Sequence, residues 1–396
     1  ATLFRLIDAS GLPTRMAELL RRFTNPRFDL SPQERTLAWR LHLDLPLLTA
    51  LLMLSLLGMV VLYSASGEDM GSVVRQGVRL GVGFTALLII AQLPPRTFHY
   101  WAVPLFAAGV VLLILVLFFG SIRNGAQRWL AIPGLGLFQP SEIMKLALPI
   151  MVAWYFSKRS LPPRYTDILV ALVIVAIPSA LIANQPDLGT AILVGMAGII
   201  VLFFAGISWR IVSSAVIAAM VAAPLMYMFV LEPYQRRRVD TLFNPEADPL
   251  GAGWNIIQSK IAIGSGGLFG KGWLNGTQSR LDFLPESSTD FILAVIGEEF
   301  GFLGIAILLA LYMFIVGRSM FIAWQARETF SRLLGISLGL TFCIYVVVNM
   351  GMVSGLLPVV GVPLPLVSYG GTSAVTLLVG FGILMSIHTH RRLLPP

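Results

Sequence analysis

Long apolar runs alternate with short polar segments along most of the chain. The runs are continuous and about 18 to 22 residues long, the length that a helix needs to cross a bilayer, whereas strands of a membrane barrel are shorter and alternate in polarity. The pattern therefore predicts an all-α, polytopic integral membrane protein with about ten transmembrane helices. We expect these spans at residues 46–64, 73–92, 98–119, 141–157, 167–183, 188–206, 210–231, 289–317, 331–354 and 372–389.

Composition supports this prediction. Of the 396 residues, 56% are hydrophobic and only 12% are charged, against about 25% charged residues in an ordinary soluble domain. One soluble core cannot bury so much apolar surface, so the composition excludes a soluble globular protein. The single cysteine, Cys343, excludes an intrachain disulfide framework and a cysteine metal cluster.

Charge in the loops predicts the orientation, because cytoplasmic loops carry an excess of lysine and arginine. With the N-terminus inside, most of the 28 lysines and arginines fall on one side of the membrane. We therefore expect both termini in the cytoplasm, residues 1–44 as a cytoplasmic tail, and residues 45–392 as a single membrane domain. The formal net charge of +8 is explained by these loops, and we expect no nucleic-acid partner.

The other basic residues fall on the outer side and are concentrated in three places. They lie at the outer end of the second span, before and at the start of the fourth, and in a large extracytoplasmic loop, residues 232–288, between the seventh and eighth spans. Such a cluster favours an anionic ligand, most simply a phosphate, with anionic lipid as the alternative. The residues are Arg75, Arg79, Arg123, Arg128, Lys145, Arg236, Arg237, Arg238, Lys260, Lys271 and Arg280.

Asp290 is the central candidate for catalysis. It ends the polar interval and directly precedes the apolar segment FILAVIG, where a carboxylate is costly unless it has a task or a partner. A carboxylate near hydroxyl groups in a low dielectric is a suitable general base. The alternative is a helix N-terminal carboxylate capped by Ser288 or Thr289. Glu286 lies four residues earlier and shares a face with Asp290 if the helix has already begun.

The motif FQPSEIMK at residues 138–145 places two opposite charges inside an expected span. Glu142 and Lys145 are three residues apart and share a helix face, so they either form an ion pair that fixes packing or line a polar cavity with Lys145 facing an anion. Pro140 suits the first helical position, and Gln139 or Ser141 is the expected cap.

Two shorter motifs carry further charged candidates. Arg128, beside Trp129 in GAQRWL, is either an interface anchor or a phosphate contact. Asp187, in NQPDLGT, is best interpreted as a carboxylate stabilised at the start of the sixth span.

Two glycine-rich stretches are not explained by apolar patterning. The run IGSGGLFGKG around Lys271 does not match a P-loop, because its spacing differs and no Ser or Thr follows the lysine. A nucleotide-hydrolysing pump is therefore disfavoured, and we interpret the run as a flexible segment. Residues 355–373 contain prolines and glycines that break a helix at membrane depth, which is tolerated inside protein or beside a water-filled cavity. Ser368 and Tyr369 are expected to line that cavity.

Several motifs together resemble the SEDS family (shape, elongation, division and sporulation), and in particular its rod-shape branch. They are GAQRWL, FQPSE, QPDLGT, DPLGAGWNIIQSKIAIGSGGLFGKGWLNGTQS, LPESSTDFI and GMVSGLLPVVGVPLPLVSYGGTS, and the resemblance covers residues 45–392. It implies a peptidoglycan glycosyltransferase for cell elongation and rod shape. Its substrate would be lipid II, the undecaprenyl-pyrophosphate-linked disaccharide pentapeptide, on the outer face of the bacterial cytoplasmic membrane. The implied partners are a class B penicillin-binding protein and other proteins of the elongation complex.

The resemblance also implies roles for individual residues. Asp290 matches the essential aspartate of the family, although Ser287 and Ser288 replace an Arg-His pair that is frequent before it. Arg75, Arg128, Glu142 and Lys145 match positions important for activity. We expect Asp290 to deprotonate the acceptor hydroxyl, and Arg128, Lys145 and Lys271 to bind the departing pyrophosphate. Expected cavity-lining residues are Gln139, Asp187, Glu286, Ser368 and Tyr369.

No cofactor is certain from these motifs. A divalent cation can share the stabilisation of the pyrophosphate, but no cluster of residues identifies a metal site. The alternative functions are a lipid II flippase, which needs no base, and a non-catalytic scaffold of the elongation complex.

Overall fold

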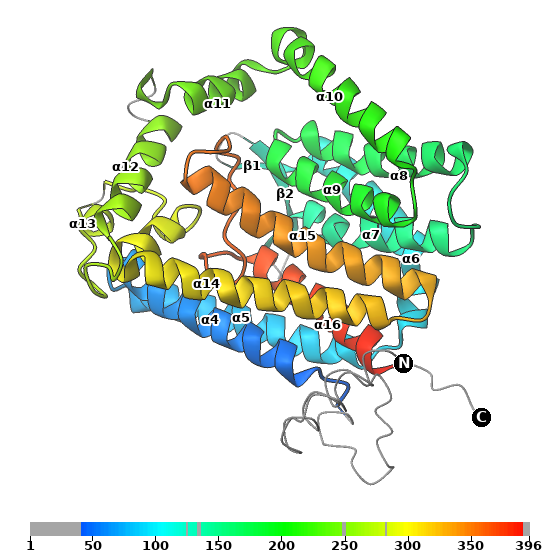
Figure 1. Cartoon of the computed structure of the whole chain (residues 1–396), viewed down its shortest axis with the longest axis horizontal. Coiled ribbons are helices and arrows are strands. Elements are labelled where there is room, and N and C mark those ends of the chain that lie inside the picture. Colours follow the sequence, from blue (N-terminus) through cyan, green and yellow to red (C-terminus); the bar gives the residue numbers. More distant parts are fainter. Residues whose placement is uncertain (1–40, 124–125, 133–135, 248–250, 282, 391–396) are drawn as a thin grey trace, which may run out of the picture. The chain divides into compact units, whose positions relative to one another are not determined.

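The computed structural model describes residues 41–123, 126–132, 136–247, 251–281 and 283–390, and we describe the unit that begins at His42. All ten expected spans are helices (Figure 1). They are α4 (Leu45–Ala65), α5 (Met70–Ala91), α6 (Pro95–Phe119), α7 (Pro140–Ser157), α8 (Tyr165–Ala183), α9 (Leu188–Phe204), α10 (Trp209–Phe229), α14 (Ile292–Gln325), α15 (Thr329–Val353) and α16 (Thr372–Thr389).

Eight of these helices are long and apolar enough to cross a membrane by length and composition alone. The other two are α9, which is apolar but has 17 residues, and α7, which carries Glu142 and Lys145 near its start. The predicted all-α, polytopic membrane architecture is confirmed. The predicted cytoplasmic tail, residues 1–44, lies outside the described residues except for its last four.

The core of the bundle is formed by α7, α9, α15 and α16. The helix pairs α5–α16, α14–α15, α6–α7 and α8–α9 pack most extensively, and α15 also packs on α7 and α9. Small residues permit the close approach that drives helix association in membranes. A Cβ on Gly382 of α16 would lie 2.8 Å from the backbone oxygen of Leu87 in α5. Helix α10 differs from the other expected spans, because none of its residues is buried.

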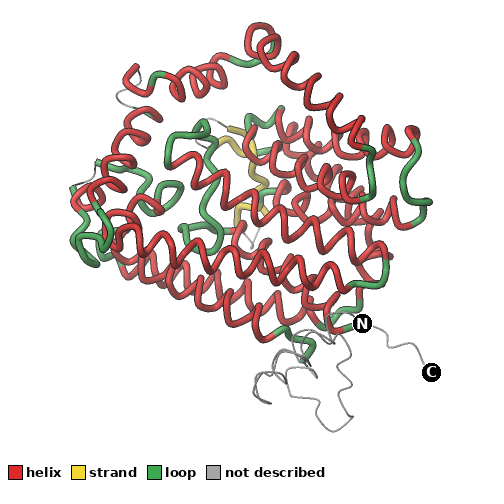
Figure 2. Tube along the Cα trace, viewed as in Figure 1, coloured by secondary structure: helices red, strands yellow, loops and turns green. Residues whose placement is uncertain are grey.

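A small sheet between α6 and α7 is not anticipated by the apolar pattern. Strands β1 (Ser121–Arg123), β2 (Ala126–Ile132) and β3 (Gly136–Phe138) form an antiparallel meander in the order β1-β2-β3 (Figure 2). Leu130 pairs with Phe138, and Ser121 pairs with Trp129. The sheet packs on α6 and α7, so it fixes the position of Arg128 on β2 relative to the start of α7.

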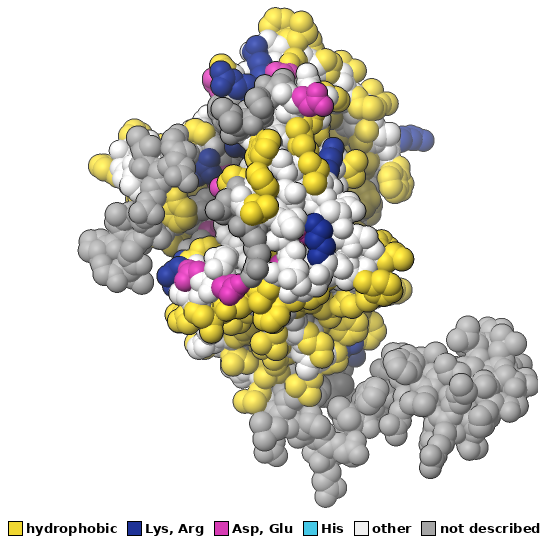
Figure 3. All heavy atoms as spheres, turned by 90° about the vertical axis from the view of Figure 1, so that its left-hand side faces the viewer, with side chains coloured by type: hydrophobic (Ala, Val, Ile, Leu, Met, Phe, Trp, Pro, Cys, Tyr) yellow, Lys and Arg dark blue, Asp and Glu magenta, His cyan; other side chains and the backbone are white. Residues whose placement is uncertain are grey.

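The large loop before α14 is mostly helical. It contains α11 (Pro233–Phe243), a 3-10 turn (Pro245–Ala247), α12 (Ala252–Ser265) and α13 (Thr277–Arg280). In Figure 1 these elements follow α10 and lead round to the start of α14. Figure 3 looks onto the end of the molecule that carries α12 and α13, where charged side chains of both signs are interspersed, whereas the flank below them is largely hydrophobic.

The glycine-rich run between α12 and α13 is held tightly against a break in α14. Gly301 breaks that helix with φ +66° and ψ −161°, a conformation open essentially to glycine alone. The run pairs with the break through backbone hydrogen bonds, from Lys271 N to Glu298 O and from Gly272 N to Glu299 O, both 2.9 Å. A Cβ on Gly270 would lie 2.1 Å from that same Glu299 oxygen. Our interpretation of the run as a flexible segment is therefore wrong: its glycines allow close backbone contact.

Candidate active site

An elongated cavity of about 850 Å³ lies between α5, α6, α7, α16, strand β2, the start of α9 and the loop before α16. One end is polar and contains Arg79, Arg128, Glu142, Lys145 and Asp187. The other end is apolar. It is lined by Val82, Ile90, Phe98, Leu105, Ile143, Leu146, Ile150, Val375, Val379 and Ile383. Arg79 and Ile90 both belong to α5, so the cavity extends roughly 16 Å along that helix.

Glu142 and Lys145 form an ion pair in the wall of this cavity. Lys145 Nζ donates to Glu142 Oε1 at 2.6 Å, and their side chains are 10% and 7% exposed. The expected sharing of a helix face is confirmed. Because the two residues form an ion pair and both line the cavity, the two alternatives, an ion pair between helix-face neighbours and a polar cavity wall, do not exclude each other. Gln139 precedes α7 but its side chain does not cap the helix.

Arg128 reaches from the sheet to the start of α9. Its Nη2 donates to the backbone oxygen of Pro186 at 2.7 Å, and its Nη1 lies 3.6 Å from Asp187 Oδ2. Asp187 caps α9 by accepting a hydrogen bond from Thr190 N at 3.2 Å, as expected for a carboxylate at a helix start. Gln139 Nε2 donates to the same carboxylate at 3.1 Å. Residues of three separate motifs thus meet at the polar end.

Asp290 lies behind the wall of the cavity. It sits in a turn before α14 begins at Ile292, so neither Ser288 nor Thr289 caps the helix, and the helix-start alternative is wrong. A Cβ on the cavity-lining residue Gly361 would lie 3.6 Å from Asp290 Oδ2. The carboxylate is therefore separated from the cavity by a residue without a side chain.

The electrostatic environment of Asp290 suits a base. Burial, reinforced by the negative charge of Glu286, raises the pKa of Asp290 to about 6, and the positive charge of Arg238 opposes this shift. A carboxyl group with that pKa is ionised at neutral pH and still basic enough to accept a proton in a reaction. Arg238, in α11, belongs to the outer basic residues expected from the sequence, and its charge acts on Asp290.

Three successive backbone carbonyls hold the segment that carries Asp290. Tyr369 N donates to Ser288 O at 2.9 Å, and Ser368 Oγ donates to Thr289 O at 2.5 Å. The third carbonyl, that of Asp290 itself, accepts from the side-chain amide of Asn349 at 2.8 Å. Sequence reasoning missed Asn349, whose only signal was a polar side chain within an apolar run. Ser368 and Tyr369 hold the Asp290 segment and do not line the cavity.

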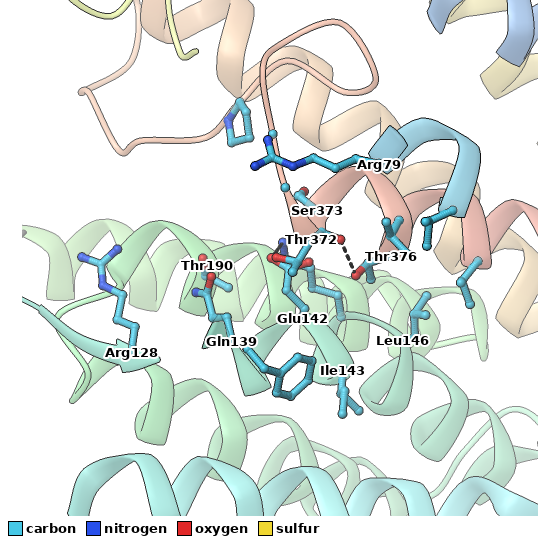
Figure 4. A pocket seen from close by; sticks show the side chains of 18 of the residues that line it. Arg79, Arg128, Gln139, Glu142, Ile143, Leu146, Thr190, Thr372, Ser373 and Thr376 are labelled. Carbon is cyan, nitrogen blue, oxygen red and sulfur yellow. Dashed lines mark hydrogen bonds and ion pairs between the residues drawn. The ribbon is translucent and has the colours of Figure 1, made fainter. Parts of the chain in front are cut away.

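Three other expected site residues lie away from the cavity lining. Lys271 Nζ donates to Glu298 Oε1 at 2.6 Å and to Thr277 Oγ1 at 2.9 Å, within the glycine-rich contact with α14. Glu286 accepts a hydrogen bond from Thr289 and influences Asp290 by its charge. Arg75 is exposed and pairs with Asp69 at 3.2 Å. Arg79, one turn further along α5, lines the cavity instead (Figure 4).

No group of three or more histidine, cysteine, aspartate or glutamate side chains is arranged to hold a metal ion within the described part of the chain.

Residues 44–393 match the family model of the FtsW, RodA and SpoVE cell cycle proteins. The chain belongs to this family. Its relatives in the family include the peptidoglycan glycosyltransferase MrdB of Escherichia coli K12, which is 50% identical over 364 residues, with 92% of this chain and 98% of MrdB covered. A probable peptidoglycan glycosyltransferase FtsW of Trichlorobacter lovleyi is 39% identical over 365 residues, with 89% and 94% covered.

Solved structures of family members share the fold. A chain of a peptidoglycan synthase complex that coordinates polymerization and crosslinking matches with a TM-score of 0.78 and 31% identity, covering 88% of this chain and 99% of the other. RodA of Thermus thermophilus matches with a TM-score of 0.66 and 30% identity, with 87% and 96% covered. The chain is thus a peptidoglycan glycosyltransferase and a multi-pass inner-membrane protein, as the motifs predicted.

Proposed function

We propose that this glycosyltransferase polymerises lipid II on the extracytoplasmic face of the membrane, with Asp290 as the general base. The observation that carries the proposal is the position of Asp290, whose carboxylate lies close to the cavity-lining residue Gly361. The cavity itself combines a cationic end with a long apolar end. A lipid-linked pyrophosphate has the same division, with charge at the membrane surface and a hydrocarbon tail below it.

In the proposed reaction, the 4-hydroxyl oxygen of the acceptor sugar attacks the anomeric carbon of the donor. The hydroxyl proton passes to the Asp290 carboxylate, the new glycosidic bond forms, and the bond between the anomeric carbon and the pyrophosphate oxygen breaks. The electron pair leaves with the undecaprenyl pyrophosphate. Arg128 and Lys145, which line the polar end, are positioned to stabilise that negative charge.

Orientation and partners follow from the same proposal. Loop charges support a cytoplasmic position for both termini, with Asp290 and the polar end of the cavity on the outer side. The proposed partner is a class B penicillin-binding protein that crosslinks the new strands, together with other elongation proteins. The similarity to a synthase complex that coordinates both reactions supports this partner.

The test is glycan formation from purified lipid II by the protein with its penicillin-binding protein in detergent. Asp290→Asn removes the proton acceptor and keeps the shape of the side chain, so we expect normal folding and partner binding but no polymer. Wild-type polymer also separates this function from a flippase or a scaffold, neither of which makes glycan. Polymer made by Asp290→Asn at the wild-type rate would contradict the role of the base.

A further inference from the structure

Arg79 lies at an unusual place for a charged residue. It is in α5, which begins at Met70, so it is roughly 13 Å along a helix long and apolar enough to span a membrane. Its side chain is half-buried and lines the polar end of the cavity. A cation at this depth is costly and marks a functional site unless a protein partner neutralises it.

The other cations at this end of the cavity have carboxylate partners. Lys145 pairs with Glu142 at 2.6 Å, and Arg128 lies 3.6 Å from Asp187. Arg79 has no carboxylate within ion-pair distance among the residues that the structure describes. The polar end therefore contains two balanced pairs and one uncompensated positive charge, which is that of Arg79.

An aromatic platform fixes the position of this charge. The guanidinium carbon of Arg79 lies 4.6 Å from the centre of the Tyr369 ring, a cation–π distance. The Tyr369 hydroxyl in turn accepts a hydrogen bond from Arg75 Nε at 3.3 Å. A guanidinium has five N–H donors, so this contact with Tyr369 leaves others available to an oxyanion. Figure 4 shows Arg128 at one side of the cavity and Arg79 above Glu142 in this view.

We propose that Arg79 is the principal binding residue for the pyrophosphate of a polyprenyl-pyrophosphate lipid, whose hydrocarbon chain occupies the apolar end of the cavity. This inference rests on the proposed function and names the residue that binds its donor and product. The pyrophosphate neutralises the charge that no carboxylate balances. A monophosphate carries fewer oxygens and less charge, so Arg79 favours the pyrophosphate over it.

The proposal is tested by direct binding, which does not require turnover. The protein carrying Asp290→Asn is titrated in detergent with undecaprenyl pyrophosphate and, separately, with undecaprenyl monophosphate. Adding Arg79→Gln should weaken pyrophosphate binding about tenfold to a hundredfold, the range for a lost hydrogen bond between charged groups, and should narrow the difference between the two lipids. Arg79→Lys keeps the charge but loses the planar set of N–H donors, so its pyrophosphate affinity should lie between those of the parent and Arg79→Gln.

Two controls separate binding from structure. Arg96→Gln removes an exposed arginine outside the cavity lining and should leave both affinities unchanged. Arg79→Gln should melt at the parent temperature or above it, because it removes a half-buried charge without leaving a carboxylate unpaired. The proposal would be overturned if Arg79→Gln kept the parent affinity for the pyrophosphate. It would also be overturned if Arg79→Gln and Arg79→Lys each weakened the binding of the two lipids equally. Because binding is measured without catalysis, failure of Asp290 as the base would leave this result unaffected.

Discussion

The side-chain amide of Asn349 joins the backbone of Asp290 to that of Val362. Asn349 Nδ2 donates to Asp290 O at 2.8 Å and to Val362 O at 2.7 Å, and the side chain is fully buried in α15. Val362 follows Gly361, the residue that separates Asp290 from the cavity. One amide on a rigid helix thus sets the distance between the proposed base and the cavity wall.

Asn349→Leu should therefore reduce glycan synthesis at least tenfold while leaving the protein folded. The change keeps a similar volume but leaves two buried carbonyls without a donor, which typically costs about 1–3 kcal/mol per group. The measurement is the polymerisation rate together with the melting temperature in detergent. Ser337→Ala is the matched control, because Ser337 is also buried in α15 and donates to Ala197 O at 2.7 Å, away from the site. Equal loss of activity in both variants would show that Asn349 contributes only stability.

The pH dependence of glycan synthesis should report the raised pKa of Asp290. The base must be ionised, so activity should fall as pH decreases through about 6. Glu286→Gln removes a negative neighbour that disfavours ionisation, so it should move this acid limb to lower pH. Arg238→Gln removes the opposing positive charge and should move the limb to higher pH. Rates measured between about pH 5 and 8 decide this, and shifts in one common direction would contradict the assignment.

The pair formed by Glu142 and Lys145 should show strong coupling in stability but not in activity. Each single change, Glu142→Gln or Lys145→Met, leaves a buried charge without its partner and should destabilise the fold by about 3 kcal/mol or more. The double variant removes both charges and should recover most of the melting temperature. It should remain inactive if Lys145 stabilises the leaving group, so an active double variant would assign the pair to packing alone.

The contact between the glycine-rich run and α14 predicts opposite effects of two glycine substitutions. Gly270→Ala places a Cβ against Glu299 O at a residue with φ +79°, so it should destabilise the protein by about 2 kcal/mol or more. Gly264 lies within α12, and a Cβ there meets no atom within 4 Å. Gly264→Ala should be neutral or stabilise by up to about 1 kcal/mol through helix propensity. Thermal melts of the two variants in the same detergent test this, and equal melting temperatures would contradict it.

The sequence alone determined the helices of this protein, because a bilayer imposes one simple requirement on any segment that crosses it. Continuous apolar runs must satisfy their backbone polar groups internally, so length and hydrophobicity are sufficient to locate α4 or α16 within a few residues. Charged motifs were visible for the same reason, since Glu142 and Asp290 stand out against an apolar background.

Only the tertiary structure decided which of those charges share a site. Arg75 and Arg79 are one helical turn apart, and the pattern of charges along the chain does not distinguish them. In the structure Arg75 is exposed beside Asp69, whereas Arg79 lines the cavity. Lys271 lies in a suggestive glycine-rich run, but Glu298 binds it. Asn349 carries no charge, and only its hydrogen bond to the Asp290 carbonyl distinguishes it from other buried polar residues. Such contacts join residues many positions apart, and their geometry depends on how the helices pack, which local pattern does not contain.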